Sequence, residues 1–422
     1  MAGLMLADVV ATSQQVTATR SRLAKRTALV ELLRRADAAD IEVAVAFMSG
    51  VLRQRRTGLG WASLRDLPPP ADTATLTIAE VDAAFEAISR LAGTGSATAR
   101  GAAATALMGR ATADEQAFLR GLVYGGLRQG ALETSLVDAV ADASGVPLAA
   151  VRRAVMLRGA VGPVATAAMT EGQGAVEAFT LTVGQPIKPM LASTAPDIAA
   201  AFDKVGAGDD STKTCVDTKL DGIRIQVHKQ GPDVSVFTRS LDDITARLPE
   251  VVTVTTALPV DRAVVDGEAI ALDQSGRPRP FQETSSRTAT QLDEIAGPPG
   301  TDVTPFFFDC LHLDGEDLID LPLRERLARL DAVTPESARI RRLVTASAEA
   351  ADTFFLDQVA AGQEGVVVKD LEAPYDAGRR GAAWVKVKPR HTLDLVVLAV
   401  EWGSGRRQGW LSNIHMGARD PD

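Results

Sequence analysis

The feature that most constrains this chain is a change of residue pattern near position 180. Before it, alanine is abundant and apolar residues recur at three- and four-residue spacing, as in "SRLAKRTALVELLRRADAAD", which is typical of amphipathic helices. After it, "GIRIQVHK", "DVSVFTRS" and similar segments alternate polar and apolar residues, which predicts half-buried strands. The pattern predicts an all-α region followed by a mixed α/β region with mostly antiparallel strands.

The same pattern suggests three domains. The turn-rich segment "FTLTVGQPIKPMLA" lies at the change, so we place an all-α domain at 1–182 and an α+β domain at 183–391. Residues 392–422 contain two more predicted strands around a glycine-rich turn. Two strands alone are rarely stable, so these either pack on the preceding domain or begin a larger β-domain that is cut short.

Charge and cysteine content narrow the classes of protein. The net charge of −9 argues against a generally basic nucleic-acid binder, so any such contact depends on local patches. The two cysteines cannot form a four-thiolate zinc site, and they fit a reducing compartment. The N-terminus lacks the basic region of a signal peptide, and no apolar run is long enough for a membrane span. We therefore expect a soluble, cytoplasmic protein.

A lysine precedes a tight turn in "TKLDGIRIQVHK", where Asp221–Gly222 follows Lys219 by two residues. An Asp-Gly pair favours a turn, which puts Lys219 at the mouth of a strand. Taken alone, this K-x-D-G-x-R pattern is as consistent with a solvated surface lysine as with a nucleophile. The residues on later predicted strands favour the nucleophile.

Those later residues have the charge types that suit a triphosphate and a divalent metal ion. Glu268 follows Asp-Gly at the predicted end of one strand, and Glu364 opens another. Lys386 and Lys388 alternate in "WVKVK", so both point to one face of a strand. Cations can hold phosphate oxygens and carboxylates can hold the metal ion. Phe308 can stack on a base.

Together these motifs resemble the covalent nucleotidyltransferases, and best the ATP-dependent DNA ligases with an N-terminal helical DNA-binding domain. The segments "FLRGLVYGGLRQGAL", "PIKPMLA" and "RPFQETSSR" are similar to segments of those ligases, so the resemblance covers nearly the whole chain. It implies a multi-domain fold: an all-α DNA-binding domain, an α+β nucleotidyltransferase (adenylation) domain, and in 392–422 an incomplete OB-type β-barrel.

The resemblance also implies roles for individual residues. Lys219 takes AMP from ATP, with Mg²⁺ or Mn²⁺ bound by Glu268 and Glu364. The contacts with the nucleotide, its phosphates or the nick come from Asp217, Arg224, Arg239, Glu268, Phe308, Arg380, Lys386 and Lys388. A lysine amine reacts only when unprotonated, a form that positive neighbours and a metal ion favour.

The implied reaction seals nicks in double-stranded DNA in three steps, during repair, replication or recombination, and we expect a monomer. AMP passes from ATP to the lysine, then to the 5′-phosphate of the nick, and the 3′-hydroxyl displaces it. Arg128, between Gly126 and Gly130, is a candidate contact with DNA phosphate, because glycine lets the backbone approach closely.

Two departures from the family pattern affect these expectations. Asp217 stands where the family has a glutamate that helps to read adenine. The sequence contains two of the roughly five strands that an OB-type barrel needs, and it lacks the basic final motif that orients pyrophosphate. We therefore expect self-adenylylation by this chain to be weak or absent.

Other functions remain open from the sequence. An RNA ligase or a guanylyltransferase would share the lysine motif, but capping enzymes generally lack a helical N-terminal domain. An NAD-dependent ligase would be expected to carry a four-cysteine zinc site. The non-enzymatic alternative is a protein that binds nicked DNA without sealing it.

Overall fold

The computed structural model describes residues 3–54, 57–127, 132–206, 214–289, 302–377, 380–390, 394–403 and 407–419. Within them the first 180 residues are helical, as predicted. The elements are α1 (Leu6–Ala18), α2 (Arg22–Arg35), α3 (Ile41–Met48), η1 (Trp61–Leu64), α4 (Ile78–Ser89), α5 (Ser96–Gly109), α6 (Ala113–Val123), α7 (Leu132–Ser144), α8 (Leu148–Arg158), α9 (Val161–Thr170) and α10 (Gln173–Glu177).

Local sequence signals set several ends of these helices. At the start of α4 the Thr77 hydroxyl accepts the Glu80 N–H while the Glu80 carboxylate accepts the Thr77 N–H, and Thr112 and Glu115 repeat this arrangement at α6. Such reciprocal caps satisfy backbone donors that have no partner inside the helix. Helix α8 ends at Gly159, whose φ of 74° is accessible to glycine.

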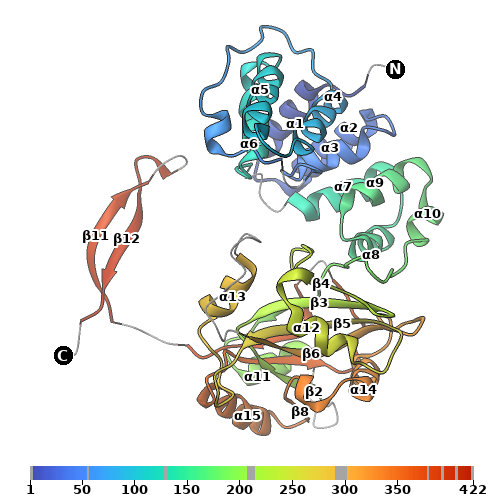
Figure 1. Ribbon diagram of the computed structural model, residues 1–422, viewed down its shortest axis with the longest axis vertical. Helices are drawn as coiled ribbons and strands as arrows, with labels where there is room; N and C mark the ends of the chain where they lie inside the picture. Colours follow the sequence, from blue (N-terminus) through green and yellow to red (C-terminus); the bar gives the residue numbers. More distant parts are fainter. Residues whose placement is uncertain are drawn as a thin grey trace.

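The α/β half contains two five-stranded sheets below the helices in Figure 1. The first has the order β1-β10-β9-β2-β8 and the second β4-β3-β5-β6-β7. Only β1 and β10 pair in parallel among these strands; the other pairs are antiparallel.

These two sheets and their covering helices are built from the following elements. They are β1 (Leu191–Thr194), α11 (Ile198–Val205), β2 (Thr214–Lys219), β3 (Ile223–Gln230), β4 (Asp233–Thr238), η2 (Thr245–Arg247), α12 (Pro249–Thr256), β5 (Arg262–Ala271), α13 (Phe281–Ala289), β6 (Val303–Leu313), β7 (Glu316–Asp317), α14 (Leu323–Val333), η4 (Glu336–Ala338), β8 (Arg342–Thr345), α15 (Ala348–Ala360), β9 (Gly365–Asp370) and β10 (Arg380–Val387). Helices α11 and α15 contact the first sheet, whereas α12 and α14 contact the second.

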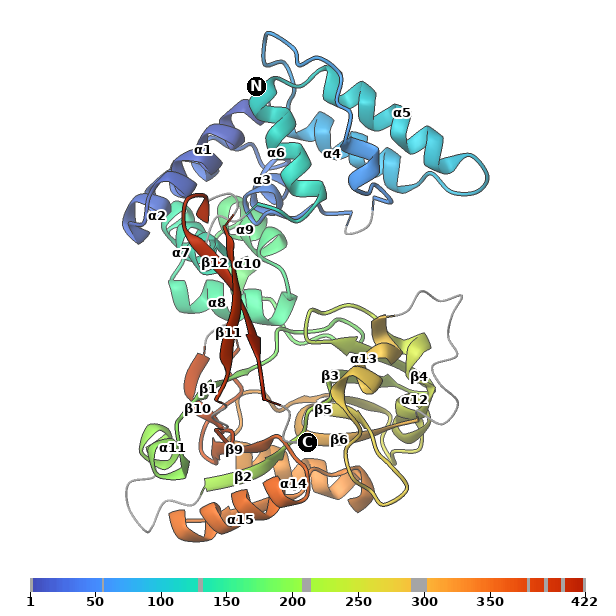
Figure 2. The same ribbon diagram turned by 90° about the vertical axis from the view of Figure 1, so that its left-hand side faces the viewer.

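Helix α8 links the two halves of the molecule. Figure 2 shows α7 to α10 between the first six helices and the sheets. The α8 residues Met156 and Leu157 are buried against the α/β half in what we call the junction cluster. Its buried members are Met156, Leu157, Leu181, Ile187, Met190, Val264, Leu311, Ile319, Tyr375, Ala377 and Trp384.

The prediction that β3 is half-buried is wrong, because its polar face is buried as well. Gln226 is 3% exposed and His228 is 1% exposed. Gln226 accepts the Ile187 N–H (2.8 Å) and His228 accepts the Gly184 N–H (3.0 Å). The polar side chains of this strand thus form hydrogen bonds with the segment that joins the two halves.

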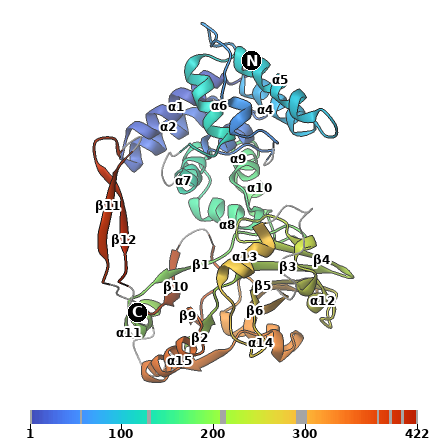
Figure 3. The ribbon, with the colours of Figure 1, turned by 60° about the vertical axis from the view of Figure 1, so that its left-hand side comes forward.

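The last two strands, β11 (Val396–Trp402) and β12 (Leu411–Gly417), form an antiparallel hairpin. Figures 1 and 3 show it to one side of the sheets. Its apolar side chains are exposed, including Leu398, Trp402 and Trp410. In the described part of the chain, no helix combines the length and the apolar character that a membrane crossing requires.

Candidate active site

Lys219 lies where the chain crosses from one sheet to the other. It is the last residue of β2 in the first sheet, and Asp221–Gly222 leads into β3 of the second. A Cβ on Gly222 would lie 2.5 Å from the backbone oxygen of Ala269, so this close crossing requires glycine. The lysine therefore stands at the seam between the sheets.

A pocket of about 230 Å³ opens at this seam. It is lined by Leu191, Ala192, Asp217, Thr218, Lys219, Leu220, Arg224, Arg239, Glu268, Phe308, Ile340, Val367, Lys369, Trp384 and Lys386. Seven of the residues predicted from the sequence line it, although they come from segments far apart in the chain. Arg128 and the side chain of Arg380 lie outside the described residues.

Glu364 bridges two amines beside the pocket. One carboxylate oxygen forms an ion pair with Lys219 and the other with Lys388. Burial would raise the pKa of Glu364, but hydrogen bonds from the two lysines outweigh it and lower that pKa. The Glu364 N–H donates to the Lys219 carbonyl (3.1 Å). The next residue must be glycine, because a Cβ on Gly365 would lie 2.2 Å from the Val387 oxygen.

Glu268 lies inside β5, directly opposite Arg224 on β3. The prediction that it ends a strand is wrong, since β5 continues to Ala271. Burial raises the pKa of Glu268 to about 7, against the opposing effects of Arg224, Lys219 and a hydrogen bond from the Gly222 N–H. Its carboxyl group therefore changes charge near neutral pH.

Asp217 lines the pocket and is paired with a buried lysine. It is 2% exposed, and its carboxylate lies 2.6 Å from the Lys369 amine. That amine also lies 4.2 Å from the ring centroid of Trp384 and 4.6 Å from that of Phe308. The shorter side chain at position 217 is thus paired with a buried cation on the pocket wall.

The sequence motifs gave no role to several residues that shape this pocket. Lys369 and Trp384 form part of its wall, and Asp266 and Tyr375 lie behind Arg224. Lys369, Trp384 and Asp266 stand within or beside the predicted motifs, so their place in the sequence could have indicated a place at the site. Tyr375 is one of only two tyrosines in the chain, but no local pattern connects it to the pocket.

The fold and this pocket define a covalent nucleotidyltransferase, with a lysine between two sheets and cations and carboxylates around it. Residues 189–388 match the family model described as ATP dependent DNA ligase domain, and residues 63–141 match DNA ligase N terminus. The chain is 62% identical to a probable DNA ligase of Beutenbergia cavernae, over 99% of this chain and 82% of that protein.

A second relative carries the same name, and a solved structure has the same fold. A probable DNA ligase of a Nocardioides species is 59% identical over 99% of this chain and 81% of its own length. The solved structure Pmar-Lig_PreS3 has the same fold at a TM-score of 0.62, with 18% identity over 98% of this chain and 85% of that one. This chain belongs to the ATP-dependent DNA ligases, which confirms the resemblance.

Proposed function

We propose that this DNA ligase uses Lys219 as the nucleophile that carries AMP to a nick in duplex DNA. The observation that carries this proposal is the position of its amine beside Glu364, at the edge of a pocket lined by residues from both sheets. In the first step the lysine nitrogen bonds to the α-phosphorus of ATP and the bond to pyrophosphate breaks. The 5′-phosphate of the nick then takes the AMP, and the 3′-hydroxyl displaces it.

The nucleotide is held by the pocket wall. Phe308 offers a ring face to adenine, and the Arg224 guanidinium, 5.4 Å from that ring centroid, serves the ribose. Lys386 lines the pocket, and with Lys388 it neutralises the α-phosphate, whose charge otherwise repels the attacking amine. Arg239 is exposed at the pocket rim, where it serves the nick.

Glu268 and Glu364 suit a Mg²⁺ or Mn²⁺ ion. In the described residues no cluster of three or more histidine, cysteine, aspartate or glutamate side chains could hold a metal. Mg²⁺ commonly uses one or two carboxylates together with phosphate oxygens and water, so two glutamates beside a phosphate site fit it. Such an ion supplies charge neutralisation at the phosphate.

We propose that the DNA substrate is nicked duplex, bound by a monomer through the helical domain (1–182) together with the adenylation domain (183–391). The match of residues 63–141 to the ligase N-terminal family supports this role for the helices. The exposed apolar hairpin supports assignment of 392–422 to the start of an OB-type domain. A cytoplasmic location is the expectation for an enzyme that maintains chromosomal DNA.

Pre-adenylylated nicked DNA tests whether the chain performs the sealing chemistry. We expect Mg²⁺-dependent sealing that falls by about 10²-fold in Lys386→Ala, because one cation is lost from the transition state. Lys204→Ala, on α11 and outside the pocket, should seal like the wild type. Binding of the nick without sealing, at any Mg²⁺ concentration, would instead support a protein that only binds nicks.

The pH profile tests the role of Glu268. Its pKa of about 7 means that the carboxyl group is mostly neutral at lower pH. A neutral carboxyl group binds a metal ion poorly. At Mg²⁺ concentrations too low to saturate the site, we expect kcat/KM for sealing the pre-adenylylated nick to fall by up to about tenfold per pH unit below pH 7 and to level off above it. Saturating Mg²⁺ should move this fall to lower pH, because a bound cation favours the ionised carboxylate. Glu349→Gln, on the exposed first turn of α15, should keep this profile. A flat profile from pH 6 to pH 8 would exclude Glu268 from the rate-determining chemistry.

A further inference from the structure

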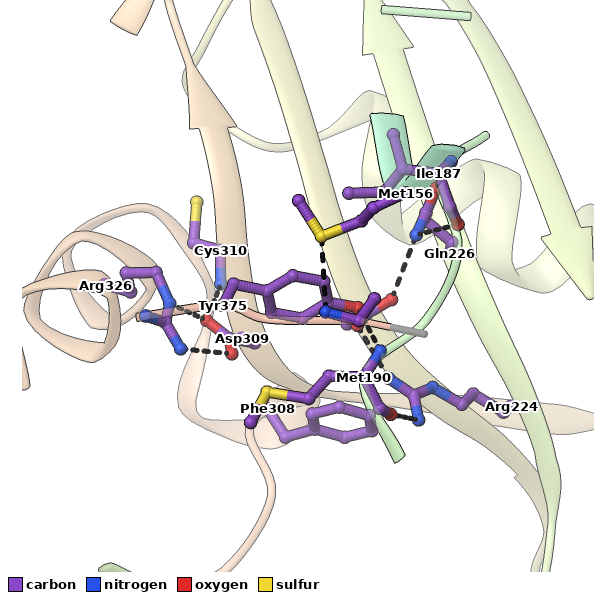
Figure 4. Close-up of polar contacts among 12 residues, drawn as sticks. Met156, Ile187, Met190, Arg224, Gln226, Phe308, Asp309, Cys310, Arg326 and Tyr375 are labelled. Carbon is purple, nitrogen blue, oxygen red and sulfur yellow. Dashed lines mark hydrogen bonds and ion pairs between the residues drawn. The ribbon is translucent and has the colours of Figure 1, made fainter. Parts of the chain in front are cut away.

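A closed ring of hydrogen bonds lies behind the nucleotide pocket. Arg224 donates to the Asp266 carboxylate (2.8 Å) and to the Met190 carbonyl (2.6 Å). The Tyr375 hydroxyl donates to the same Asp266 oxygen (2.6 Å) and accepts the Met190 N–H (3.0 Å). Each of the four residues therefore contacts two others in the ring, and Figure 4 shows Tyr375 between Arg326 and Arg224.

The ring is shielded from water. Asp266 is fully buried, and Tyr375 and Met190 are 2% and 3% exposed. A buried carboxylate needs compensation, and Arg224 and Tyr375 provide it from opposite sides. Neither partner can turn away without leaving a polar group unpaired in a dry environment.

The ring fixes the direction of the Arg224 guanidinium. On the pocket side that group lies 5.4 Å from the Phe308 ring centroid and 5.6 Å from that of Trp384. On the opposite side, two of its nitrogens donate to the Asp266 carboxylate and to the Met190 carbonyl. Tyr375 forms hydrogen bonds with both of these residues. Removing the tyrosine hydroxyl would take one hydrogen bond from Asp266 and one from Met190 without deleting any pocket-lining side chain.

Tyr375 is itself held by its surroundings. The Arg326 guanidinium lies 5.8 Å from its ring centroid, and Arg326 also donates to the carbonyl of Ala373 (3.1 Å). On the other side, the Ala377 N–H contacts the Met156 sulfur of α8 (3.3 Å). The segment from 373 to 377 is therefore fixed by both halves of the molecule.

We propose that Tyr375 is a positioning residue for nucleotide binding, which orients Arg224 through Asp266 and Met190 without touching the nucleotide. This inference rests on the proposed role of Arg224 at the ribose. It gives Tyr375 a function that differs from packing: the hydroxyl, rather than the ring, determines how well AMP is bound.

A double-mutant cycle tests this inference on the full chain, with AMP as the ligand and titration calorimetry as the measurement. We expect Tyr375→Phe to bind AMP about tenfold more weakly, the cost of a lost buried hydrogen bond. Arg224→Lys, which cannot hold both acceptors, should also weaken binding. In the double variant the loss should be no larger than the greater single loss, because both changes break the same ring.

The matched control is Tyr124→Phe, at the only other tyrosine of the chain and in the helical half; it should bind AMP like the wild type. Thermal unfolding of each variant ensures that binding is measured on folded protein. Unchanged affinity in Tyr375→Phe, or losses that multiply in the double variant, would overturn the inference. In either case, weaker AMP binding by Arg224→Lys would still support the nucleotide site. If the wild-type chain and all variants fail to bind AMP, the proposed function fails, and this inference fails with it.

Discussion

Lys219→Ala is expected to lose all the covalent AMP label and all the ATP-driven nick sealing that the wild-type chain shows, because Lys219 both contacts Glu364 and lines the pocket. Lys388 contacts the same carboxylate but is not among the residues that line the pocket. Sealing of a pre-adenylylated nick should remain within about tenfold of the wild type, since that step does not need the lysine as nucleophile. The measurements are labelling with α-³²P-ATP and gel assays of both DNA substrates.

Lys204→Ala is again the matched control for this prediction, because it removes an amine that donates to a backbone carbonyl on the surface. It should retain whatever label and sealing the wild type shows. Covalent AMP on the Lys219→Ala chain would mean that the nucleophile lies elsewhere. Loss of both sealing reactions in Lys219→Ala would mean that the lysine also maintains the pocket.

Arg326→Met is expected to destabilise the α/β half by about 3–5 kcal/mol, because it leaves a buried carboxylate without its cation. Arg326 and Asp309 are both 0% exposed and share two hydrogen bonds of 2.8 and 3.0 Å. The measurement is urea unfolding followed by the fluorescence of Trp384, which is buried in the junction cluster, in a background where the other tryptophans are replaced by phenylalanine.

Two further variants separate the buried charge from the loss of packing. Asp309→Leu combined with Arg326→Met should recover much of the stability, because it leaves no unpaired charge. Arg90→Met, at an exposed ion pair with Glu86, should change stability by less than about 1 kcal/mol. A loss below 1 kcal/mol in Arg326→Met would contradict the role of the buried pair.

The sequence was most informative where chemistry and local pattern coincide. Helical spacing before residue 180 and strand alternation after it predicted the order of the two halves, and the K-x-D-G-x-R motif with its later array predicted the family. The pocket brings Lys219, Glu268, Phe308 and Lys386 together, because β2 and β10 of one sheet and β5 and β6 of the other border it. Motif order therefore predicted which residues meet.

What the sequence could not predict depends on pairing between distant segments. Tyr375 and Asp266 are 109 residues apart, and Lys369 neutralises Asp217 only because β2 and β9 are neighbours. The alternation in β3 predicted an exposed polar face, but the segment carrying Ile187 covers it. Periodicity reports one strand at a time and contains no information about what packs on it.

The junction cluster has a consequence for how the molecule comes apart. Met156 and Leu157 of α8 are buried with Tyr375 and Trp384 of the α/β half, and burying each such side chain contributes roughly 1.5–3 kcal/mol. A single proteolytic cut between the halves would accordingly leave two fragments that stay associated and melt together. The change in residue pattern near 180 marks a change in architecture, whereas we expect the cooperative unit of unfolding to extend across it because the cluster is shared by both halves.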